Sequence, residues 1–214
     1  MDLRRASLSG AKFGGDPSKV FRGARLYRAH LEGANLQSAS LVRADLCKAH
    51  LEGANLFHAD LHEADLREAH LDGASLFGAT LTGATLTYAR MAKANLGGVN
   101  HDSERGFVNL EGANLEGASL LNANLKGAWL SGANLTGANL EGAHLEGAQL
   151  RHVEGGVAMD CIGLTPEQVR TAYIDDATIL PFDRSLLNLS STERPPRESV
   201  MKETDEEPPS DNGD

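Results

Sequence analysis

Three histidines recur at intervals of twenty residues, and each is followed two positions later by a carboxylate. They are His30, His50 and His70, and the strings that contain them are AHLEGANL at 29–36 and 49–56 and AHLDGASL at 69–76. Imidazole nitrogens and carboxylate oxygens are common ligands of zinc, and histidine also titrates near neutral pH. The spacing allows two interpretations: a metal or proton-linked site, or a solvent-facing surface copied by tandem duplication.

These strings contain a finer rhythm of five residues: a small residue, usually Ala, then any residue, then Leu, then two more. The rhythm runs from Phe21 to Leu96 and again from Val108 to Leu150. In an α-helix, five residues advance about 140° beyond a full turn, so the leucines would spiral around every face. In a strand, residues two apart share a side, so Ala and Leu point inward and their neighbours outward. The rhythm therefore predicts short strands joined by corners.

The twenty-residue recurrence predicts how many corners close each coil. If every fourth pentapeptide stacks on the same side, the three long strings lie directly above one another. A three-sided coil would instead predict likeness at fifteen residues, but 44–51 reads ADLCKAHL and does not match AHLEGANL. Phe57 and Phe77, also twenty residues apart, agree with four sides. We therefore expect a four-sided, all-β solenoid of about seven coils over residues 1–153.

This arrangement divides the side chains into an inner and an outer set. The inner set is apolar and includes Leu31, Leu36, Leu51, Leu56, Leu71, Ala34, Ala54 and Ala74. In the outer set, a partner surface would be formed by aromatic and histidine side chains, and isolated exposed aromatics are the alternative. Its members are Phe57, Phe77, Trp129, His30, His50 and His70. An outward asparagine series is expected to bond the local backbone, at Asn35, Asn55, Asn95, Asn114 and Asn134.

The corners and the histidine ladder carry two further expectations. Glycine is frequent at the corner, but Ser38, Arg43 and Lys48 occupy the same position, so we expect that a left-handed φ is not required there. A flat ladder is expected to converge on no single point, as a metal ion requires, so we predict no metal site and no cofactor. The sequence contains no nucleophile–base grouping or phosphate loop, so we predict no catalytic residue and no enzyme activity.

The tandem strings of the form A-(D/N)-L-x-x resemble the pentapeptide repeat family. The best examples are ANLQS (34–38), ADLCK (44–48), ADLHE (59–63), ADLRE (64–68), ANLKG (123–127) and ANLTG (133–137). The resemblance implies a right-handed, four-sided β-helix. It also implies a possible function, because some relatives mimic DNA, bind gyrase or topoisomerase IV, and protect the enzyme from inhibitors.

The distribution of charge bears on that function. Residues 1–28 have a net charge of +5, residues 29–153 of −6 and residues 154–214 of −9. A nearly neutral repeat body argues against a duplex-like potential. The basic start, which includes Arg4, Arg5 and Lys12, either touches phosphates or is simply solvated, and we expect no nucleic-acid partner. The main prediction is a non-catalytic scaffold that binds a protein, with the DNA mimic as the alternative.

Interruptions and a change of composition mark the remaining segments. Gly- and Pro-containing stretches predict loops near 14–20 and 97–107. Thr165-Pro166-Glu167-Gln168 is a capping box that predicts a helix over 165–173, within a segment 154–189 that either covers the solenoid end or dimerises. The Pro- and acid-rich residues 190–214 are expected to be disordered.

Two observations concern the compartment and the assembly. Only Cys47 and Cys161 are present, and no apolar run or leader-like pattern appears, so we expect a cytoplasmic protein that is neither secreted nor membrane-spanning. The repeats begin at Asp2, so either the first coil is an exposed edge that pairs with another molecule, or Met1 is not the natural start. A homodimer through a solenoid end is one expected partner arrangement.

Overall fold

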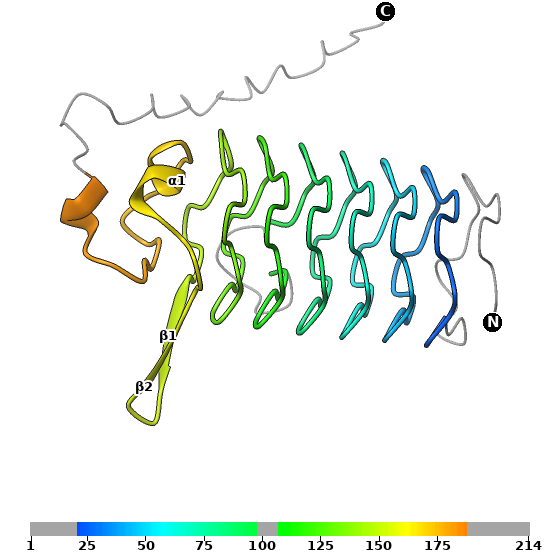
Figure 1. The fold of residues 1–214 in the computed structure, drawn as a ribbon, viewed down its shortest axis with the longest axis horizontal. Coiled ribbons are helices and arrows are strands. Elements are labelled where there is room, and N and C mark those ends of the chain that lie inside the picture. The colour runs from blue at the N-terminus through cyan, green and yellow to red at the C-terminus, as the bar shows by residue number, and fades with distance from the viewer. Residues whose placement is uncertain (1–20, 98–106, 188–214) are drawn as a thin grey trace, which may run out of the picture.

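Stacked coils form an elongated rod in the computed structural model, which describes residues 21–97 and 107–187 (Figure 1). The predicted loops near 14–20 and 97–107 and the predicted tail at 190–214 lie wholly or largely outside these residues. So does the start of the repeat, and the expected pairing through that end stays a prediction. The described part of the chain contains no apolar helix of membrane-spanning length.

Parallel β-bridges join residues that are twenty apart in the sequence. Four bridges link the first described coil to the second: Arg25 to Asp45, His30 to His50, Asn35 to Asn55, and Ser40 to Asp60. Each coil therefore has four short sides, which we name the Arg25, His30, Asn35 and Ser40 sides. Where residues 98–106 intervene, the bridged residues are 29 apart in the sequence, as Thr80 and Asn109 are. Each side of one coil still pairs with the same side of the next.

The backbone of each coil is bonded mainly to the coils above and below it. The N–H of Leu51 donates to the carbonyl of His70 at 2.7 Å, and the N–H of His50 donates to the carbonyl of Ala29 at 2.9 Å. Within each corner, the N–H of the next Ala returns to the Leu carbonyl, as from Ala54 to Leu51 at 3.0 Å. The coil is thus closed by its corners and held in place by its neighbours.

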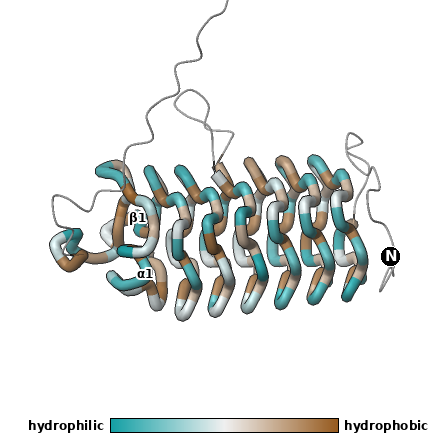
Figure 2. The backbone as a smooth tube through the Cα atoms, turned by 90° about the horizontal axis from the view of Figure 1, so that it is seen from above, coloured by the Kyte–Doolittle hydropathy of each residue, from teal (hydrophilic) through white to brown (hydrophobic). Residues whose placement is uncertain are grey.

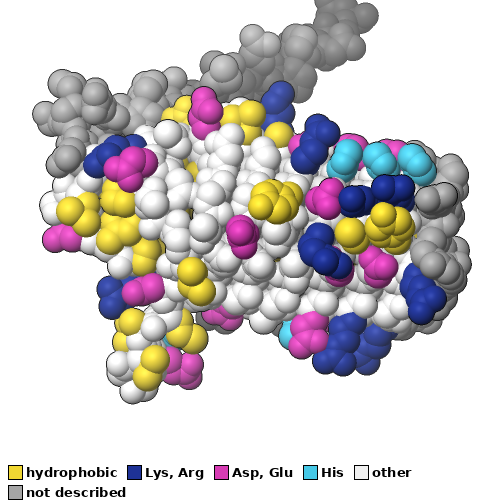
Figure 3. Space-filling model, viewed as in Figure 1, with side chains coloured by type: hydrophobic (Ala, Val, Ile, Leu, Met, Phe, Trp, Pro, Cys, Tyr) yellow, Lys and Arg dark blue, Asp and Glu magenta, His cyan; other side chains and the backbone are white. Residues whose placement is uncertain are grey.

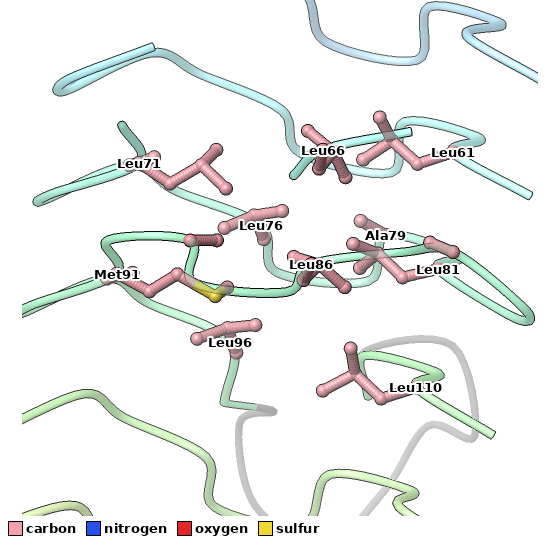
Figure 4. Packing of buried hydrophobic residues seen from close by; sticks show 14 of the residues in the cluster. Leu61, Leu66, Leu71, Leu76, Ala79, Leu81, Leu86, Met91, Leu96 and Leu110 are labelled. Atoms are coloured by element: carbon pink, nitrogen blue, oxygen red, sulfur yellow. The ribbon is translucent and has the colours of Figure 1, made fainter. Parts of the chain in front are cut away.

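Leu and Ala side chains from all four sides fill the interior. The eight inner residues expected from the sequence are each at most 1% exposed. Leu61, Leu66, Leu71 and Leu76 of one coil point toward the centre of the rod and stack on Leu81 and its neighbours in the next coil (Figure 4). Hydrophobic and hydrophilic residues accordingly alternate along the coils (Figure 2).

The preference for Asn or Asp at the outward position has a local explanation. Oδ1 of Asp65 accepts a hydrogen bond from the N–H of Arg67 at 3.1 Å, and this N–H belongs to a corner residue that the inter-coil ladder does not use. The asparagine series forms the same bond, which confirms the expectation for Asn35, Asn55, Asn95, Asn114 and Asn134. A short side-chain acceptor therefore stabilises each corner that follows it.

Every described corner has a left-handed φ at its second residue, whichever residue occupies it. The φ angle is 56° at Ser38, 55° at Arg43 and 58° at Lys48, close to the 61° of Gly33. The expectation that left-handed φ is not required there is therefore wrong. A tight turn of this type needs φ > 0 at that position, and stacking repeats the same turn in every coil. The ladder imposes the conformation even where a side chain makes it costly.

Beyond Leu150 the chain leaves the rod as a β-hairpin (Figure 1). Strand β1 (Arg151–Glu154) pairs antiparallel with β2 (Val157–Asp160). Gly155 and Gly156 connect them with φ of 58° and 82°, as a two-residue type I′ turn requires. This hairpin was not expected from the sequence, and the predicted boundary between residues 153 and 154 falls inside β1.

After the hairpin the chain returns to the rod and pairs with the last regular coil. Ile162 bridges to Asn134, Tyr173 to His144 and Ile179 to Gln149, all in parallel. Helix α1 (Pro166–Arg170) and the 3₁₀ helix η1 (Arg184–Leu187) lie within and after this irregular coil. The helix is shorter than the expected 165–173.

Helix α1 carries the expected capping box and faces the end of the rod. The hydroxyl of Thr165 accepts from the Gln168 N–H at 3.3 Å, and Oε1 of Gln168 accepts from the Thr165 N–H at 2.9 Å. Nε2 of Gln168 donates to the carbonyls of Leu135 and Ala138 in the last regular coil. Val169 is only 1% exposed but lies outside the core of the rod, and helix α1 contacts η1.

The two cysteines are free and differ in environment. Cys161 follows the hairpin directly, is 8% exposed, and donates from Sγ to the Leu130 carbonyl at 2.8 Å. Burial raises the pKa of its thiol to about 12. Cys47 is a partly exposed corner residue, and its pKa is raised mainly by partial burial and next by Asp65.

The corner geometry predicts that Ser38→Gly stabilises the protein. Glycine adopts the left-handed φ at Ser38 without strain, so we expect the free energy of unfolding to rise by up to about 1 kcal/mol. Ser40→Gly is the matched control: Ser40 lies in an extended side, where glycine should destabilise by about 0.5–1 kcal/mol. Urea unfolding followed by circular dichroism measures both. Equal effects of the two substitutions would contradict the corner geometry.

The cysteine environments predict unequal alkylation. Because the thiolate is the reactive form, iodoacetamide at about pH 8 should modify Cys47 in the folded protein and modify Cys161 only on unfolding. Intact-protein mass spectrometry over time should show one addition, then a second when urea is added. Cys47→Ser should leave the folded protein unmodified. Two additions at similar rates under native conditions would show that Cys161 is not buried in this way.

Candidate functional site

The three histidines form a continuous column on the His30 side. His30 bridges to His50 and His50 bridges to His70. The first two rings stack in parallel, with centroids 4.7 Å apart and an interplanar angle of 5°. The rings of His50 and His70 are 4.6 Å apart but inclined at 60°. A row of His side chains is visible on the N-terminal half of the rod, beside basic and acidic side chains (Figure 3).

The inclination of His70 comes from its acidic partner. Nδ1 of His30 lies 2.8 Å from Oε1 of Glu32, in its own coil. His70 instead contacts the preceding coil, with Nδ1 3.1 Å from Oε1 of Glu52. The same oxygen is 3.4 Å from Nδ1 of His50. Glu52 therefore lies between two histidines from successive coils.

The third copy of the string differs because it carries Asp72 in place of Glu. Oδ1 of Asp72 accepts from the N–H of Ala92 at 2.9 Å, and Oδ2 lies 2.9 Å from the guanidinium of Arg90. The shorter side chain is thus held by the following coil. His70 therefore contacts Glu52, which is also the partner of His50. The near-identity of the three strings did not predict this shared contact.

The His and Glu side chains of the histidine column converge more than expected. One ligand atom from each of His50, Glu52 and His70 lies within 4.8 Å of the others, and the same holds for His30, Glu32 and His50. The premise that a flat ladder converges on no point, on which the prediction of no metal site rested, is therefore wrong. Flexible side chains bend toward one another even though their Cα atoms lie in a flat column.

The ionisation of Glu32 is affected by the neighbouring imidazoles. Partial burial is the largest single effect and tends to raise the pKa of Glu32, but the hydrogen bond from His30, a backbone hydrogen bond and the charges of His30 and His50 together outweigh it, and the pKa is lowered. A carboxylate with a lowered pKa stays ionised to lower pH, and an ionised carboxylate is the form that binds a cation.

A shallow depression lies beside the ladder, at the corner between the Arg25 and His30 sides. Its lining residues are Arg28, Lys48, His50, Glu68, His70, Tyr88 and Arg90. Lys48 is paired with Glu68 at 3.2 Å, and Arg90 is paired with Asp72. The charges are thus of mixed sign and largely compensated, which does not favour a dedicated anion site.

Aromatic side chains form a separate cluster at the corner between the Asn35 and Ser40 sides. The rings of Phe57 and Phe77 stack with centroids 5.2 Å apart and an interplanar angle of 3°. His58 lies edge-on to Phe57 at 4.2 Å. We call Phe57, His58 and Phe77 the aromatic corner.

The six residues of the expected partner surface do not share one face. Trp129, which is 36% exposed, lies in the Ser40 column, two bridges beyond Thr80. It therefore shares the Ser40 side with the aromatic corner. The histidine column lies on the opposite side of the four-sided coil. Sequence spacing alone predicted each column, but it did not predict that the two columns lie on opposite sides of the rod.

Several exposed apolar residues were missed by sequence reasoning. They lie on the hairpin and on the irregular last coil, at Val153, Val157, Met159, Ile162 and Ile179. The Gly155–Gly156 pair between short β-prone runs was the available signal for the hairpin. Repetition offered no guidance here, because the segment departs from the repeat.

Comparison with known proteins gives a consistent result. The family model described as pentapeptide repeats matches residues 20–53, 54–87, 64–100, 107–137 and 130–154, as eight copies. These matches cover more than half of the chain. No curated protein sequence matches it significantly.

Several solved structures are similar. HetL, a pentapeptide repeat protein involved in heterocyst differentiation regulation in the cyanobacterium Nostoc sp. strain PCC 7120, is 34% identical, with a TM-score of 0.56 over 83% of this chain and 82% of HetL. A pentapeptide repeat protein from the Arabidopsis thaliana thylakoid lumen is 29% identical over 46% of this chain and 70% of its own, with a TM-score of 0.37. QnrB1, a plasmid-mediated fluoroquinolone resistance protein, is 24% identical over 82% of this chain and 80% of its own, with a TM-score of 0.35. This chain therefore belongs to the pentapeptide repeat family.

Proposed function

We propose that this protein is a non-catalytic scaffold that binds a protein partner through its outer surface. The observation that carries the proposal is the aromatic corner, where two stacked phenylalanines and a histidine lie on a rigid backbone. Aromatic side chains that are already ordered lose little entropy on binding and are common at the centres of protein interfaces.

The position of the aromatic corner supports the same role. Phe57 and Phe77 are only partly exposed, and Trp129 lies further along the rod on the adjoining Ser40 side. Because the coil backbone is bonded internally, a partner would meet side chains at fixed spacing. Similarity to HetL, which is involved in heterocyst differentiation regulation, also favours a binding role over substrate turnover.

The alternative is a DNA mimic that binds gyrase or topoisomerase IV. Such a mimic needs an extended column of negative charge. The outward Arg25 column contains only Asp45 and Asp65 in succession, and Thr85 and Asn114 follow them. These short acidic stretches favour the scaffold.

The proposal also covers the C-terminal segment, the number of coils and the cellular compartment. Residues 154–189 act as the cover of the solenoid end, supported by the packing of Leu164 and Ile174 against the core of the rod and by the bonds from Gln168 to the last regular coil. The repeat accounts for about seven coils when residues 1–20 are included. Two free cysteines support a reducing, cytoplasmic location.

Substitution of the aromatic corner tests the proposal. Phe57→Ser combined with Phe77→Ser should weaken capture of the partner from the native host's lysate about tenfold or more, because truncating interface aromatics costs on the order of 2 kcal/mol. Tyr88→Ser is the control, since Tyr88 is 61% exposed at the diagonally opposite corner. Quantitative mass spectrometry of the captured proteins compares the variants, and circular dichroism checks their folding. Equal losses in both variants would count against the aromatic corner.

A parallel assay separates the scaffold from the DNA mimic. Purified gyrase is tested for DNA supercoiling, with and without a fluoroquinolone, in the presence of micromolar protein. The scaffold proposal expects no change in either reaction. Protection of gyrase from the drug would establish the alternative.

A further inference from the structure

The histidine column differs from the outward positions of the rod that carry Asn or Asp. Asn and Asp at the outward position accept from the N–H two residues later, as Asn55 does from Phe57 at 3.1 Å. At His50 the side chain instead approaches Glu52, its second neighbour along the chain. The column thus exchanges a side-chain–backbone bond for a His–carboxylate contact.

The contacts around Glu52 have the dimensions of a metal site. Zinc bonds of about 2.0–2.2 Å in a tetrahedron place neighbouring ligand atoms about 3.3 Å apart. Oε1 of Glu52 is 3.4 Å from Nδ1 of His50 and 3.1 Å from Nδ1 of His70. One nitrogen from each imidazole and one oxygen of Glu52 all lie within 4.8 Å of one another. A modest rotation of the imidazoles would bring all three atoms around one ion.

A second observation concerns the other oxygen of the same carboxylate. Oε2 of Glu52 is buried and has no hydrogen-bond partner among the described residues. A buried carboxylate oxygen without a donor is costly, and a cation held by this carboxylate would offset that cost. The three side chains are each between 28% and 35% exposed, so an ion can enter from solvent.

We propose that His50, Glu52 and His70 form a binding site for a divalent transition-metal ion of the zinc type. Two imidazoles and one carboxylate suit zinc, cobalt or nickel better than the hard ions magnesium and calcium. Three protein ligands leave a fourth position for water or for a ligand atom from a partner. The site lies on the side opposite the aromatic corner, so it does not depend on the proposed scaffold surface.

The site is tested by metal titration of the full-length protein without an affinity tag. Isothermal titration calorimetry with zinc chloride should show one ion per chain, and cobalt should give the absorption of a tetrahedral complex. Magnesium chloride, which should not bind, is the negative control. His50→Asn and His70→Asn should each weaken zinc binding about tenfold or more, because each removes a ligand. Equivalent outward positions carry Asn, so these variants are expected to fold, which thermal unfolding verifies.

Two further variants distinguish this site from general histidine binding. His144 forms a similar contact, with Nδ1 3.1 Å from Oε1 of Glu146, but its ring stacks on Tyr173 and not on a second histidine. His144→Asn and His30→Asn should therefore leave zinc affinity within about twofold. In zinc-loaded protein, NMR signals of His50 and His70 should shift while those of His144 do not.

Several results would overturn the proposal. One is the absence of stoichiometric zinc binding to the folded protein. Another is binding that survives His50→Asn, which would show that the ion lies elsewhere. An equal loss in His144→Asn would indicate non-specific binding to surface histidines. A loss in His30→Asn as large as that in His70→Asn would place the ion at the neighbouring His30–Glu32–His50 group.

Discussion

The inter-coil backbone ladder is the constraint on which the rest of the structure depends. Each side of a coil is only three extended residues long, too short to persist by itself, and its N–H and carbonyl groups find partners in the coils above and below. Burial of one Leu and one Ala per side adds to this, but only stacked coils bury them fully. Stability is therefore collective, and every coil must accept the conformation of its neighbours.

That constraint explains the corners. A left-handed φ appears at Ser38, Arg43 and Lys48 as it does at glycines, because a corner that departed from it would lose register with the coils on both sides. The same argument accounts for Asn and Asp at the outward position, where their Oδ1 accepts from a corner N–H outside the ladder. The residues of the family motif are thus explained by one geometric requirement, that every coil repeats the conformation of its neighbours.

Much of the fold was predictable because repetition averages over local uncertainty. The recurrence of AHLEGANL at twenty residues predicted four sides, and the bridge from His30 to His50 has that separation. Family membership and the parallel bridges confirm a β-solenoid. Prediction failed for the Gly155–Gly156 hairpin because it lies outside the repeat and has no second copy. It also failed for the corner φ, because amino-acid preference alone was used to judge that angle.

The candidate site was predictable only in part, for a different physical reason. Register placed His50 and His70 in one column, but which carboxylate each would contact depends on side-chain length and rotamer. The change from Glu to Asp at residue 72 brings that side chain to Arg90 and leaves Glu52 between two histidines. Two nearly identical strings therefore gave unequal surroundings.

The central claim, that every coil is held by its neighbours through a five-residue pattern, is tested most directly by amide hydrogen exchange followed by NMR. In most pentapeptides four of the five amides donate to backbone carbonyls, and the first corner residue does not. The account predicts slow exchange at His50, Leu51, Gly53 and Ala54 and fast exchange at Glu52, with Phe57 slower than Glu52 because Asn55 accepts from it. Protection without a five-residue period, or equal exchange at Glu52 and its neighbours, would contradict the ladder.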